Sequence, residues 1–130
     1  IIISPIYETN SMGFNGDNFY NLVCSFVTKM DLYILKKFLN DIESNHGRSF
    51  SETKFSPRTL DIDILYFDKI ITKNKKIEIP RKEILRYDFV LQPLTDIAPD
   101  FIHPEIGLSH INILKKGDYE RLIIKKVYLD

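Results

Sequence analysis

Apolar residues in the first part of the chain gather in two runs rich in β-branched and aromatic side chains, with a polar stretch between them. Residues 1–8 make the first run and residues 19–28 the second, and this composition predicts a β-strand in each. Pro5 has no backbone N–H to donate to a sheet, so it indicates an edge position or a bulge in the first strand. Residues 9–18, rich in asparagine and glycine, are predicted to form the connecting loop.

The apolar spacing changes to that of a helix after Asp31, whose short acidic side chain suits the residue that caps a helix N-terminus. The pattern predicts a helix through about Asn45, with Gly47 as its stop. Its apolar stripe, spaced i, i+3, i+4 and i+7, consists of Leu35, Phe38, Leu39 and Ile42. We expect this stripe to face the core.

Shorter elements are predicted in the second half of the chain. Residues 59–67 are predicted to form a third strand, which pairs with residues 70–72 in a hairpin. Two short helices over 83–87 and 89–97 follow, and the tail is expected to hold a further short helix and a strand over 122–128. Irregular alternation of strands and helices with hairpin connections favours an α+β fold over a doubly wound parallel sheet. A length of 130 residues suits a single domain, residues 1–130.

Composition excludes several classes of protein. The chain is 44% hydrophobic and 28% charged with a formal net charge of zero, which is ordinary for a globular protein and argues against a nucleic-acid or anionic-membrane surface. No apolar run is long enough to span a bilayer, and the opening residues lack the basic flank of a signal peptide. The single cysteine, Cys24, lies in an apolar run and is expected to be a buried thiol, so a reducing, cytoplasmic compartment is predicted.

The most informative residues are Asp61 and Asp63, which alternate with leucine and isoleucine in the predicted third strand. On a strand the two carboxylates point to the same face, with Cα atoms roughly 6.5–7 Å apart. Such like charges repel each other unless a cation lies between them, and a pair of magnesium ions bridging a polyphosphate would supply it. The alternative is that both aspartates simply face water.

Three cations precede these aspartates and suit the binding of ATP with magnesium. Arg58 lies at the mouth of the same strand and could stabilise negative charge on a phosphoryl group, while Arg48 and Lys54 lie in the segment before it. Each of them alone could equally form a surface salt bridge. Since the chain has neither a Walker A motif nor GxGxxG, side chains and metal would have to hold the nucleotide.

A second group of residues suits a planar heterocycle. Alternation places Phe19 and Asn21 on one face of the second strand, and an amide that both donates and accepts is able to read the edge of such a ring. Phe89 could supply the other stacking face. The alternative is an asparagine at a sheet edge, with both phenylalanines in the core.

These residues resemble the motifs of the 6-hydroxymethyl-7,8-dihydropterin pyrophosphokinases, and the resemblance extends from about Tyr7 to Ile111. The most specific element runs from Glu43 through Gly47-Arg48 to Phe55-Ser56-Pro57-Arg58-Thr59-Leu60-Asp61-Ile62-Asp63. Supporting elements are Met12-Gly13, Phe19-Tyr20-Asn21, Ile79-Pro80-Arg81, Phe89-Val90-Leu91-Gln92-Pro93-Leu94 and Ile97-Ala98-Pro99. The resemblance implies an enzyme of folate biosynthesis that transfers diphosphate from ATP to the pterin and releases AMP.

The resemblance also implies a role for each matching residue. Asp61 and Asp63 would bind two magnesium ions, and Arg48 and Arg58 would contact the phosphates and assist transfer. The residues implied at the ATP site are Glu43, Lys54, Arg58, Arg81 and Lys82. The residues implied at the pterin site are Thr9, Asn10, Ser11, Met12, Phe19, Asn21 and Phe89. Phe55 stands where the family usually has a tryptophan in a mobile loop.

The family fold implied is a ferredoxin-like antiparallel α+β sheet with flanking helices, in a monomer. The chain begins at what corresponds to the second strand of the family, so an N-terminally truncated form, without the first strand and helix and their Gly-Ser-Asn motif, is expected. Asn10-Ser11 replaces a Pro-Pro pair, Arg81 stands where a histidine is common, and Tyr87 replaces an arginine.

Two other functions stay open from the residues. The chain could be a truncated or degenerate relative that folds poorly or binds without catalysing, because a missing strand would leave an open sheet edge. It could also be a small interaction domain whose aspartate pair is solvated and whose open edge pairs with a partner strand.

Overall fold

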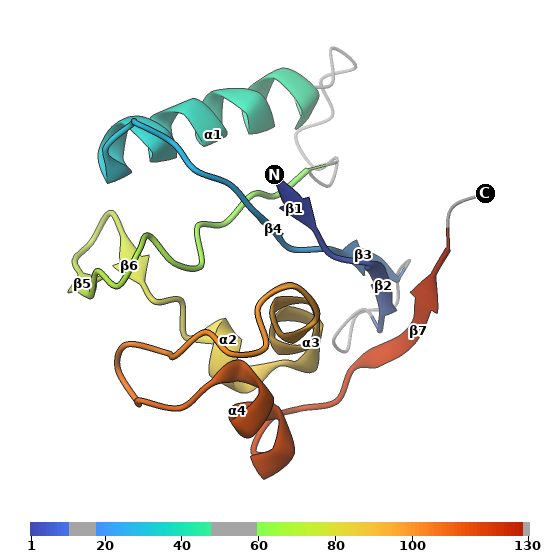
Figure 1. The fold of residues 1–130 in the computed structure, drawn as a ribbon. Helices are drawn as coiled ribbons and strands as arrows, with labels where there is room; N and C mark the ends of the chain where they lie inside the picture. The colour runs from blue at the N-terminus through green and yellow to red at the C-terminus, as the bar shows by residue number, and fades with distance from the viewer. Residues whose placement is uncertain (11–17, 48–59, 129–130) are drawn as a thin grey trace.

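The computed structural model describes residues 1–10, 18–47 and 60–128, and the strands and helices in these ranges are shown in Figure 1. The strands are β1 (Ile2–Ile3), β2 (Ile6–Thr9), β3 (Phe19–Asn21), β4 (Cys24–Ser25), β5 (Thr72–Lys73), β6 (Glu78–Ile79) and β7 (Ile123–Val127). The helices are α1 (Leu32–Gly47), α2 (Glu83–Arg86), α3 (Asp88–Ile97) and α4 (His110–Lys116). The α+β class is confirmed, and every strand pair within a named sheet is antiparallel.

The first two predicted strands form one long hairpin that is interrupted halfway. β2 lies between β3 and β7 in a three-stranded sheet, and β1 pairs with β4 in a separate ribbon. Ser4 links the two pieces, because its N–H donates to the carbonyl of Val23 at 2.8 Å and its hydroxyl accepts from the N–H of Val23, also at 2.8 Å. The break falls at Ser4 and Pro5, as expected for a proline that cannot donate to a ladder.

Strand β7 is anchored by a buried carboxylate at the start of α3. The two oxygens of Asp88 accept the N–H groups of Leu122 and Ile123, at 2.9 and 3.1 Å. Asp88 is only 8% exposed, so these bonds replace its lost hydration. They fix the start of β7 against the start of α3.

Two apolar clusters form the core of the described residues. The larger one lies where α2, α3 and α4 meet, and its buried members are Ile84, Leu91, Leu94 and Ile113. The smaller one joins the start of α1 to β6, and its buried members are Leu32, Ile77 and Ile79, with Ile64 and Phe67 packed against them. This smaller cluster positions the chain that carries the predicted acidic pair.

Helix α1 begins as predicted, because the carboxylate of Asp31 accepts the N–H of Ile34 at 2.9 Å. It continues to Gly47, slightly beyond the predicted end. The expectation for its apolar stripe is wrong at Phe38, which is 48% exposed, while Leu35 is buried. The small cluster includes α1 only at Leu32, near the start of the helix, and does not extend to Phe38.

The predicted third strand is absent from the described part of that segment. Residues 60–66 form no ladder, and β5 pairs with β6 instead of with them. A turn does form at Asp68, where the N–H of Ile70 donates to the carbonyl of Phe67 at 3.1 Å. The turn redirects the chain without closing a hairpin, because the partner of Thr72 is Ile79.

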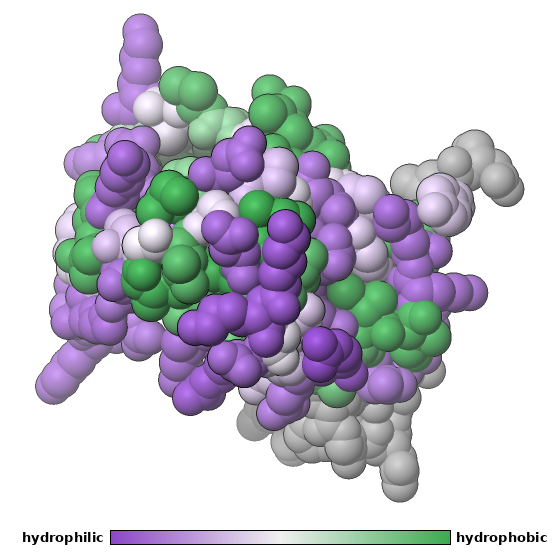
Figure 2. Space-filling model, turned by 60° about the horizontal axis from the view of Figure 1, so that its bottom comes forward, coloured by the Kyte–Doolittle hydropathy of each residue, from purple (hydrophilic) through white to green (hydrophobic). Residues whose placement is uncertain are grey.

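The expectation of a buried thiol is also wrong, since Cys24 is exposed. It belongs to the β1–β4 ribbon, which has only two strands, and such a ribbon leaves its faces open in the described structure. On the face shown in Figure 2, hydrophilic side chains dominate and hydrophobic ones form separate patches. The described helices include none with the length and apolarity needed to cross a bilayer.

A buried aromatic cluster joins the chain after the acidic pair to α4. The ring of Tyr66 lies 4.7 Å from that of Phe101 and 5.6 Å from that of His110, measured between centroids. Nδ1 of His110 lies 2.7 Å from the carbonyl of Ala98, which only accepts, so Nδ1 carries the proton. Nε2 therefore accepts from the Tyr66 hydroxyl at 2.9 Å, and the folded state holds His110 neutral.

Stability is predicted to fall on mild acidification. Burial lowers the pKa of His110 below its ordinary 6.5, although the bond to Ala98 opposes this shift. Burial also lowers the pKa of His103, despite the opposing charge of Glu105. Both histidines therefore bind protons more readily in the unfolded chain than in the folded one. The free energy of unfolding has its full value above pH 6.5 and declines as the pH falls below 6.5.

Urea unfolding at a series of pH values from 7.5 to 5 measures this decline. A His110→Gln variant is the control, because glutamine can still donate to Ala98 but does not titrate. We expect a flatter dependence on pH in that variant, and an identical slope in both proteins would contradict the assignment.

Candidate functional site

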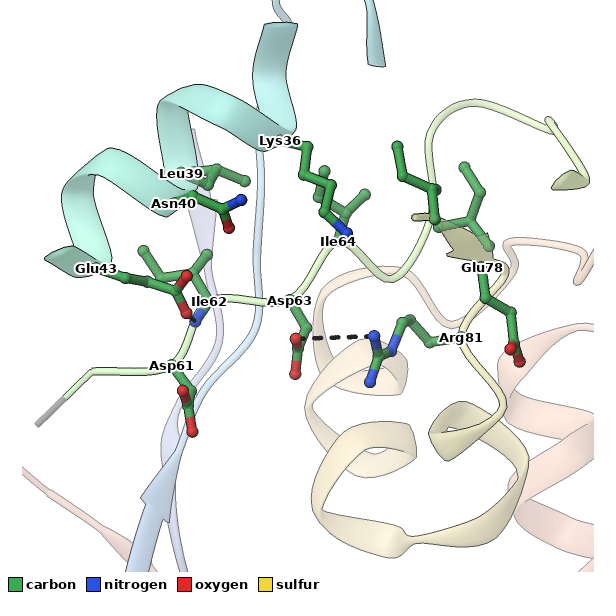
Figure 3. A pocket seen from close by; sticks show the side chains of 12 residues that line it. Lys36, Leu39, Asn40, Glu43, Asp61, Ile62, Asp63, Ile64, Glu78 and Arg81 are labelled. Carbon is green, nitrogen blue, oxygen red and sulfur yellow. Dashed lines mark hydrogen bonds and ion pairs between the residues drawn. The ribbon is translucent and has the colours of Figure 1, made fainter. Parts of the chain in front are cut away.

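A pocket of about 200 Å³ lies between the second half of α1, the segment after residue 60 and the chain from β6 to α2 (Figure 3). The residues that line it are Lys36, Leu39, Asn40, Glu43, Asp61, Ile62, Asp63, Ile64, Ile77, Glu78, Ile79 and Arg81. Four residues predicted from the sequence are therefore brought together here, namely Glu43, Asp61, Asp63 and Arg81. They come from three parts of the chain, so only the fold makes them neighbours.

Asp61 and Asp63 project to the same side of their segment, as predicted (Figure 3). Both are exposed, whereas Ile62 and Ile64 between and after them are partly buried. Side chains alternate between the two sides of the segment although residues 60–66 have no strand partner. An extended chain turns successive side chains to opposite sides whether or not it is paired. The prediction of a shared acidic face is thus confirmed, while its assumed cause, a strand in a sheet, is wrong.

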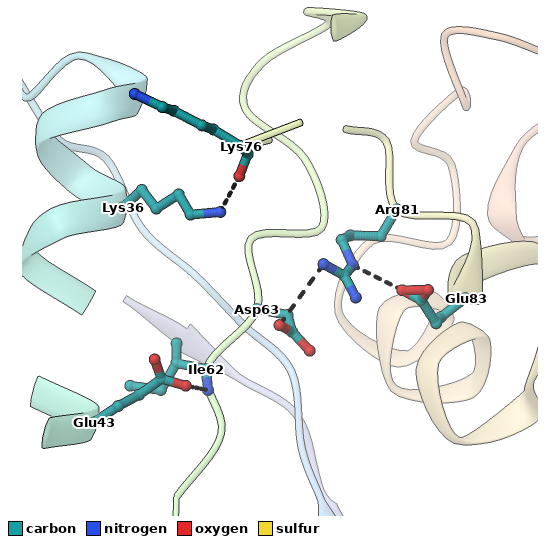
Figure 4. Close-up of polar contacts among 7 residues, drawn as sticks. All are labelled: Lys36, Glu43, Ile62, Asp63, Lys76, Arg81 and Glu83. Carbon is teal, nitrogen blue, oxygen red and sulfur yellow. Dashed lines mark hydrogen bonds and ion pairs between the residues drawn. The ribbon is translucent and has the colours of Figure 1, made fainter. Parts of the chain in front are cut away.

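Side chains and single backbone bonds hold this unpaired segment in place. Oε2 of Glu43 on α1 accepts the N–H of Ile62 at 2.8 Å (Figure 4). The N–H of Arg81 donates to the carbonyl of Leu65 at 3.1 Å, and Ile64 packs against the cluster around Leu32. Glu43 therefore reaches the pocket as predicted, with one carboxylate oxygen committed to the backbone between the two aspartates.

Arg81 is the cation that faces Asp63. Its Nη1 lies 3.9 Å from Oδ1 of Asp63, and its Nε donates to Oε2 of Glu83 at 2.7 Å (Figure 4). Burial lowers the pKa of Arg81, but the Glu83 hydrogen bond and the charges of Asp63, Glu83 and Glu78 outweigh this effect and raise the pKa. The guanidinium thus stays charged at any physiological pH.

The remaining predicted ATP-site residues have different outcomes. Lys82 is exposed at the start of α2 and is not among the residues that line the pocket. Arg48, Lys54 and Arg58, together with Phe55, lie outside the described residues, so their predicted roles stay predictions.

Sequence reasoning missed several residues that line the pocket. Asn40 precedes Glu43 by three positions on α1, which is the spacing of neighbours on one helix face and could have revealed it. Lys36, one turn earlier, donates from its ammonium group to the carbonyl of Lys76. Glu78 is on β6, and no sequence signal marks its approach, since it depends on how β6 packs beside the acidic segment.

The donor set suits magnesium. Asp61 and Asp63 offer carboxylate oxygens, which magnesium prefers, and they border a cavity. Among the described residues, no group of three or more histidine, cysteine, aspartate or glutamate side chains could form a cage around an ion. Magnesium does not need one, because it commonly keeps water molecules and takes phosphate oxygens beside one or two carboxylates. The residues present thus fit this metal together with a phosphate-bearing ligand.

Four of the predicted pterin residues, Thr9, Phe19, Asn21 and Phe89, lie on β2, β3 and the start of α3. Thr9 and Asn21 are in contact, because Nδ2 of Asn21 donates to Oγ1 of Thr9 at 3.1 Å. Phe19 pairs with Thr9 across the strands and is 50% exposed, so its expected alternative role in the core is wrong. Phe89 stacks on Tyr87, with ring centroids 5.1 Å apart and an angle of 15° between the planes.

Two more of the predicted pterin residues lie outside the described residues, namely Ser11 and Met12. Asn10 is exposed, and its N–H donates to the carbonyl of Leu122 at 3.2 Å. This bond continues the pairing of β2 with the chain before β7.

Comparison with known proteins gives a family and several relatives. The model of the 7,8-dihydro-6-hydroxymethylpterin-pyrophosphokinase family matches residues 1–99. The folic acid synthesis protein FOL1 of Dictyostelium discoideum is 42% identical over 107 residues, which are 82% of this chain and 16% of that protein. The folic acid synthesis protein fol1 of Pneumocystis carinii is 36% identical over 114 residues, 87% of this chain and 15% of that protein.

A smaller relative is the 2-amino-4-hydroxy-6-hydroxymethyldihydropteridine pyrophosphokinase of Aquifex aeolicus. It is 34% identical over 103 residues, which are 78% of this chain and 64% of that protein. The chain therefore spans less than two thirds of the length of this relative, and a much smaller share of the two folic acid synthesis proteins.

The bond from Ile62 to Glu43 predicts a graded response to substitution. Glu43→Ala removes the acceptor and leaves a partly buried N–H unsatisfied, so the acidic segment loses its tether to α1. Because a hydrogen bond to a charged group contributes about 1.5–3 kcal/mol, we expect binding of an ATP analogue with magnesium to weaken about 10-fold or more. Isothermal titration calorimetry measures this affinity.

Glu43→Gln is the matched variant, because its amide oxygen can still accept the N–H of Ile62. We expect it to bind the analogue more tightly than Glu43→Ala does. Equal losses in the two variants would show that the charge of Glu43, and not its bond to the backbone, supports binding.

Proposed function

Because the chain belongs to the 7,8-dihydro-6-hydroxymethylpterin-pyrophosphokinase family, we propose that it acts in the transfer of diphosphate from ATP to 6-hydroxymethyl-7,8-dihydropterin, a step of folate biosynthesis. The observation that carries the proposal is the pair of exposed carboxylates on one side of the segment through Asp61 and Asp63, which borders a pocket with Arg81. Acidic residues in so apolar a segment suit a metal-loaded polyphosphate better than they suit a structural role.

The reaction is a substitution at phosphorus. The hydroxymethyl oxygen of the pterin forms a bond to the β-phosphorus of ATP, and the bond from that phosphorus to the oxygen bridging to the α-phosphate breaks. The electron pair of that bond leaves with AMP, and the hydroxyl proton passes to solvent. Two magnesium ions, when bound, would neutralise charge on the polyphosphate.

The residues of this chain would supply binding and alignment. Asp61 and Asp63 would hold the metal ions, and Arg81 would contribute a positive charge to the phosphates. Arg48 and Arg58 would contact the phosphates during transfer, a role that rests on the family motif. Positioning and charge neutralisation provide most of the rate in reactions of this kind.

The pterin is proposed to bind beside β2 and β3. The exposed ring of Phe19 offers a stacking face, and Asn21 carries an amide that can both donate and accept. This amide donates to Thr9, which supports a role for Thr9 in orienting it. Phe89, stacked on Tyr87, would provide the second aromatic face.

Compartment and assembly are predictions of the same kind. Composition and the family resemblance favour a cytoplasmic monomer whose partners are ATP and the pterin, without nucleic acid or membrane.

Thermal unfolding with and without an ATP analogue and magnesium separates this enzyme from an interaction domain. An increase in melting temperature that requires both compounds supports the proposal, and no increase with the pair would contradict it.

Removal of one acidic side chain is predicted to abolish turnover without unfolding the protein. Asp63→Ala deletes an exposed carboxylate, so the folded state loses little, while the metal loses a ligand. We expect AMP formation from ATP and the pterin to fall about 100- to 1,000-fold or more, the scale of losing a group that stabilises charge in the transition state. Asp100→Ala is the control, since it removes another exposed aspartate far along the chain. Full activity in Asp63→Ala would refute the metal assignment.

Substitution of Asn21 is predicted to weaken the binding of the pterin and not that of the nucleotide. Asn21→Ala removes the amide while Thr9 and Phe19 remain, so the KM for the pterin should rise about 10-fold or more, as expected for a lost recognition hydrogen bond. The affinity for the ATP analogue should not change. Asn18→Ala is the matched control, because Asn18 also donates a side-chain hydrogen bond, to Glu8 at 3.0 Å, from an exposed position. A similar rise in KM in both variants would contradict a pterin-specific role.

A further inference from the structure

Arg81 makes two unequal contacts in the structure. The bond from its Nε to Glu83 is short, at 2.7 Å, whereas its Nη1 lies 3.9 Å from Asp63 (Figure 4). The first distance is that of a charge-assisted hydrogen bond, and the second is at the outer limit of an ion pair. Glu83 therefore anchors the guanidinium, and Asp63 only shares its charge.

The charges around the pocket explain why a cation lies there. Four acidic residues line it, and two cationic ones, Lys36 and Arg81, do so as well. The ammonium group of Lys36 donates to the carbonyl of Lys76 (Figure 4). Within the described lining, Arg81 is thus the cation paired with Asp63.

The pair between Arg81 and Asp63 is well suited to exchange. The side chain of Asp63 is 59% exposed and that of Arg81 is 35% exposed, so water can replace each partner at little cost. A guanidinium has five N–H donors, and the bond to Glu83 uses the one on Nε. The guanidinium is planar, so it can tilt as one unit about the bond to Glu83 and present its Nη groups to a new acceptor while that anchor persists.

We propose that Arg81 is a resident counter-ion of the acidic pair, which the metal displaces when a nucleotide enters. This inference rests on the proposed function. Asp63 exchanges the guanidinium for magnesium, and the Nη groups of Arg81 turn to the phosphates with Glu83 as the pivot. Magnesium alone must compete with Arg81, whereas magnesium with ATP gives Arg81 a new partner. Metal and nucleotide therefore bind with positive coupling.

The inference predicts opposite changes for two ligands in one variant. Arg81→Met keeps most of the apolar stem and removes the charge, so magnesium alone should bind about 2- to 5-fold more tightly, the scale of a weak exposed ion pair. The non-hydrolysable analogue α,β-methylene-ATP, with magnesium present, should bind about 10-fold more weakly, because a charged partner of the phosphates is lost. Isothermal titration calorimetry with each ligand measures both.

Two further variants separate this role from a general loss of charge. Lys69→Met removes an exposed lysine from the turn after the acidic segment, which does not line the pocket, so neither affinity should change beyond a small non-specific loss. Arg81→Lys retains a positive charge, so it should bind magnesium alone as weakly as the unsubstituted chain does. Melting temperatures show whether each variant is folded, and Arg81→Gln, which also removes the charge, carries the test if Arg81→Met does not fold.

The outcomes distinguish this inference from the function on which it rests. If the unsubstituted chain binds the analogue with magnesium, and Arg81→Met behaves like Lys69→Met or binds both ligands more weakly, the exchange is overturned and the proposed function stands. If the unsubstituted chain does not bind the analogue with magnesium at all, the proposed function fails, and the exchange fails with it.

Discussion

An extended segment without a strand partner carries both candidate metal ligands, and the rest of the site depends on how that segment is held. Its backbone has no ladder to fix it between residues 60 and 66. The carboxylate of Glu43 accepts the N–H of Ile62, and Ile64 packs on the cluster that joins α1 to β6. The bond to Glu43, the bond from the N–H of Arg81 to the carbonyl of Leu65 and the packing of Ile64 thus replace a sheet, and they hold Asp61 and Asp63 at the pocket.

This mode of support has a functional consequence. A segment paired on both sides would resist small shifts, whereas one held at single points can adjust when a charged ligand arrives. The neighbouring cation is arranged in the same way, since Arg81 is anchored by Glu83 and only loosely paired with Asp63. The site therefore combines firm anchors, at Glu43 in the pocket lining and at Glu83 beside it, with an exchangeable contact between Arg81 and Asp63.

The second half of the chain provides the frame against which this segment packs. Helices α2, α3 and α4 bury Ile84, Leu91 and Ile113 in one cluster, and the Tyr66–His110 bond connects that frame to the end of the acidic segment. Asp88 ties β7 to the same frame. The β1–β4 ribbon, in contrast, exposes Ile2, Ile3 and Cys24. Packing is thus unevenly distributed between this frame and the open ribbon, and the pocket is lined from α1, the acidic segment and the chain from Ile77 to Arg81.

Much of the local structure of this protein follows from its sequence. The cap at Asp31, the helical spacing after it, the break at Pro5 and the shared side of Asp61 and Asp63 were all predictable, because each depends on a few neighbouring residues and on fixed backbone periods. Tertiary structure alone decided that residues 60–66 have no ladder, that Phe38 and Cys24 are exposed, and that Glu78 and Glu83 join the site. Those outcomes depend on which distant segment covers each position, and the local pattern of apolar and polar residues carries no record of that choice.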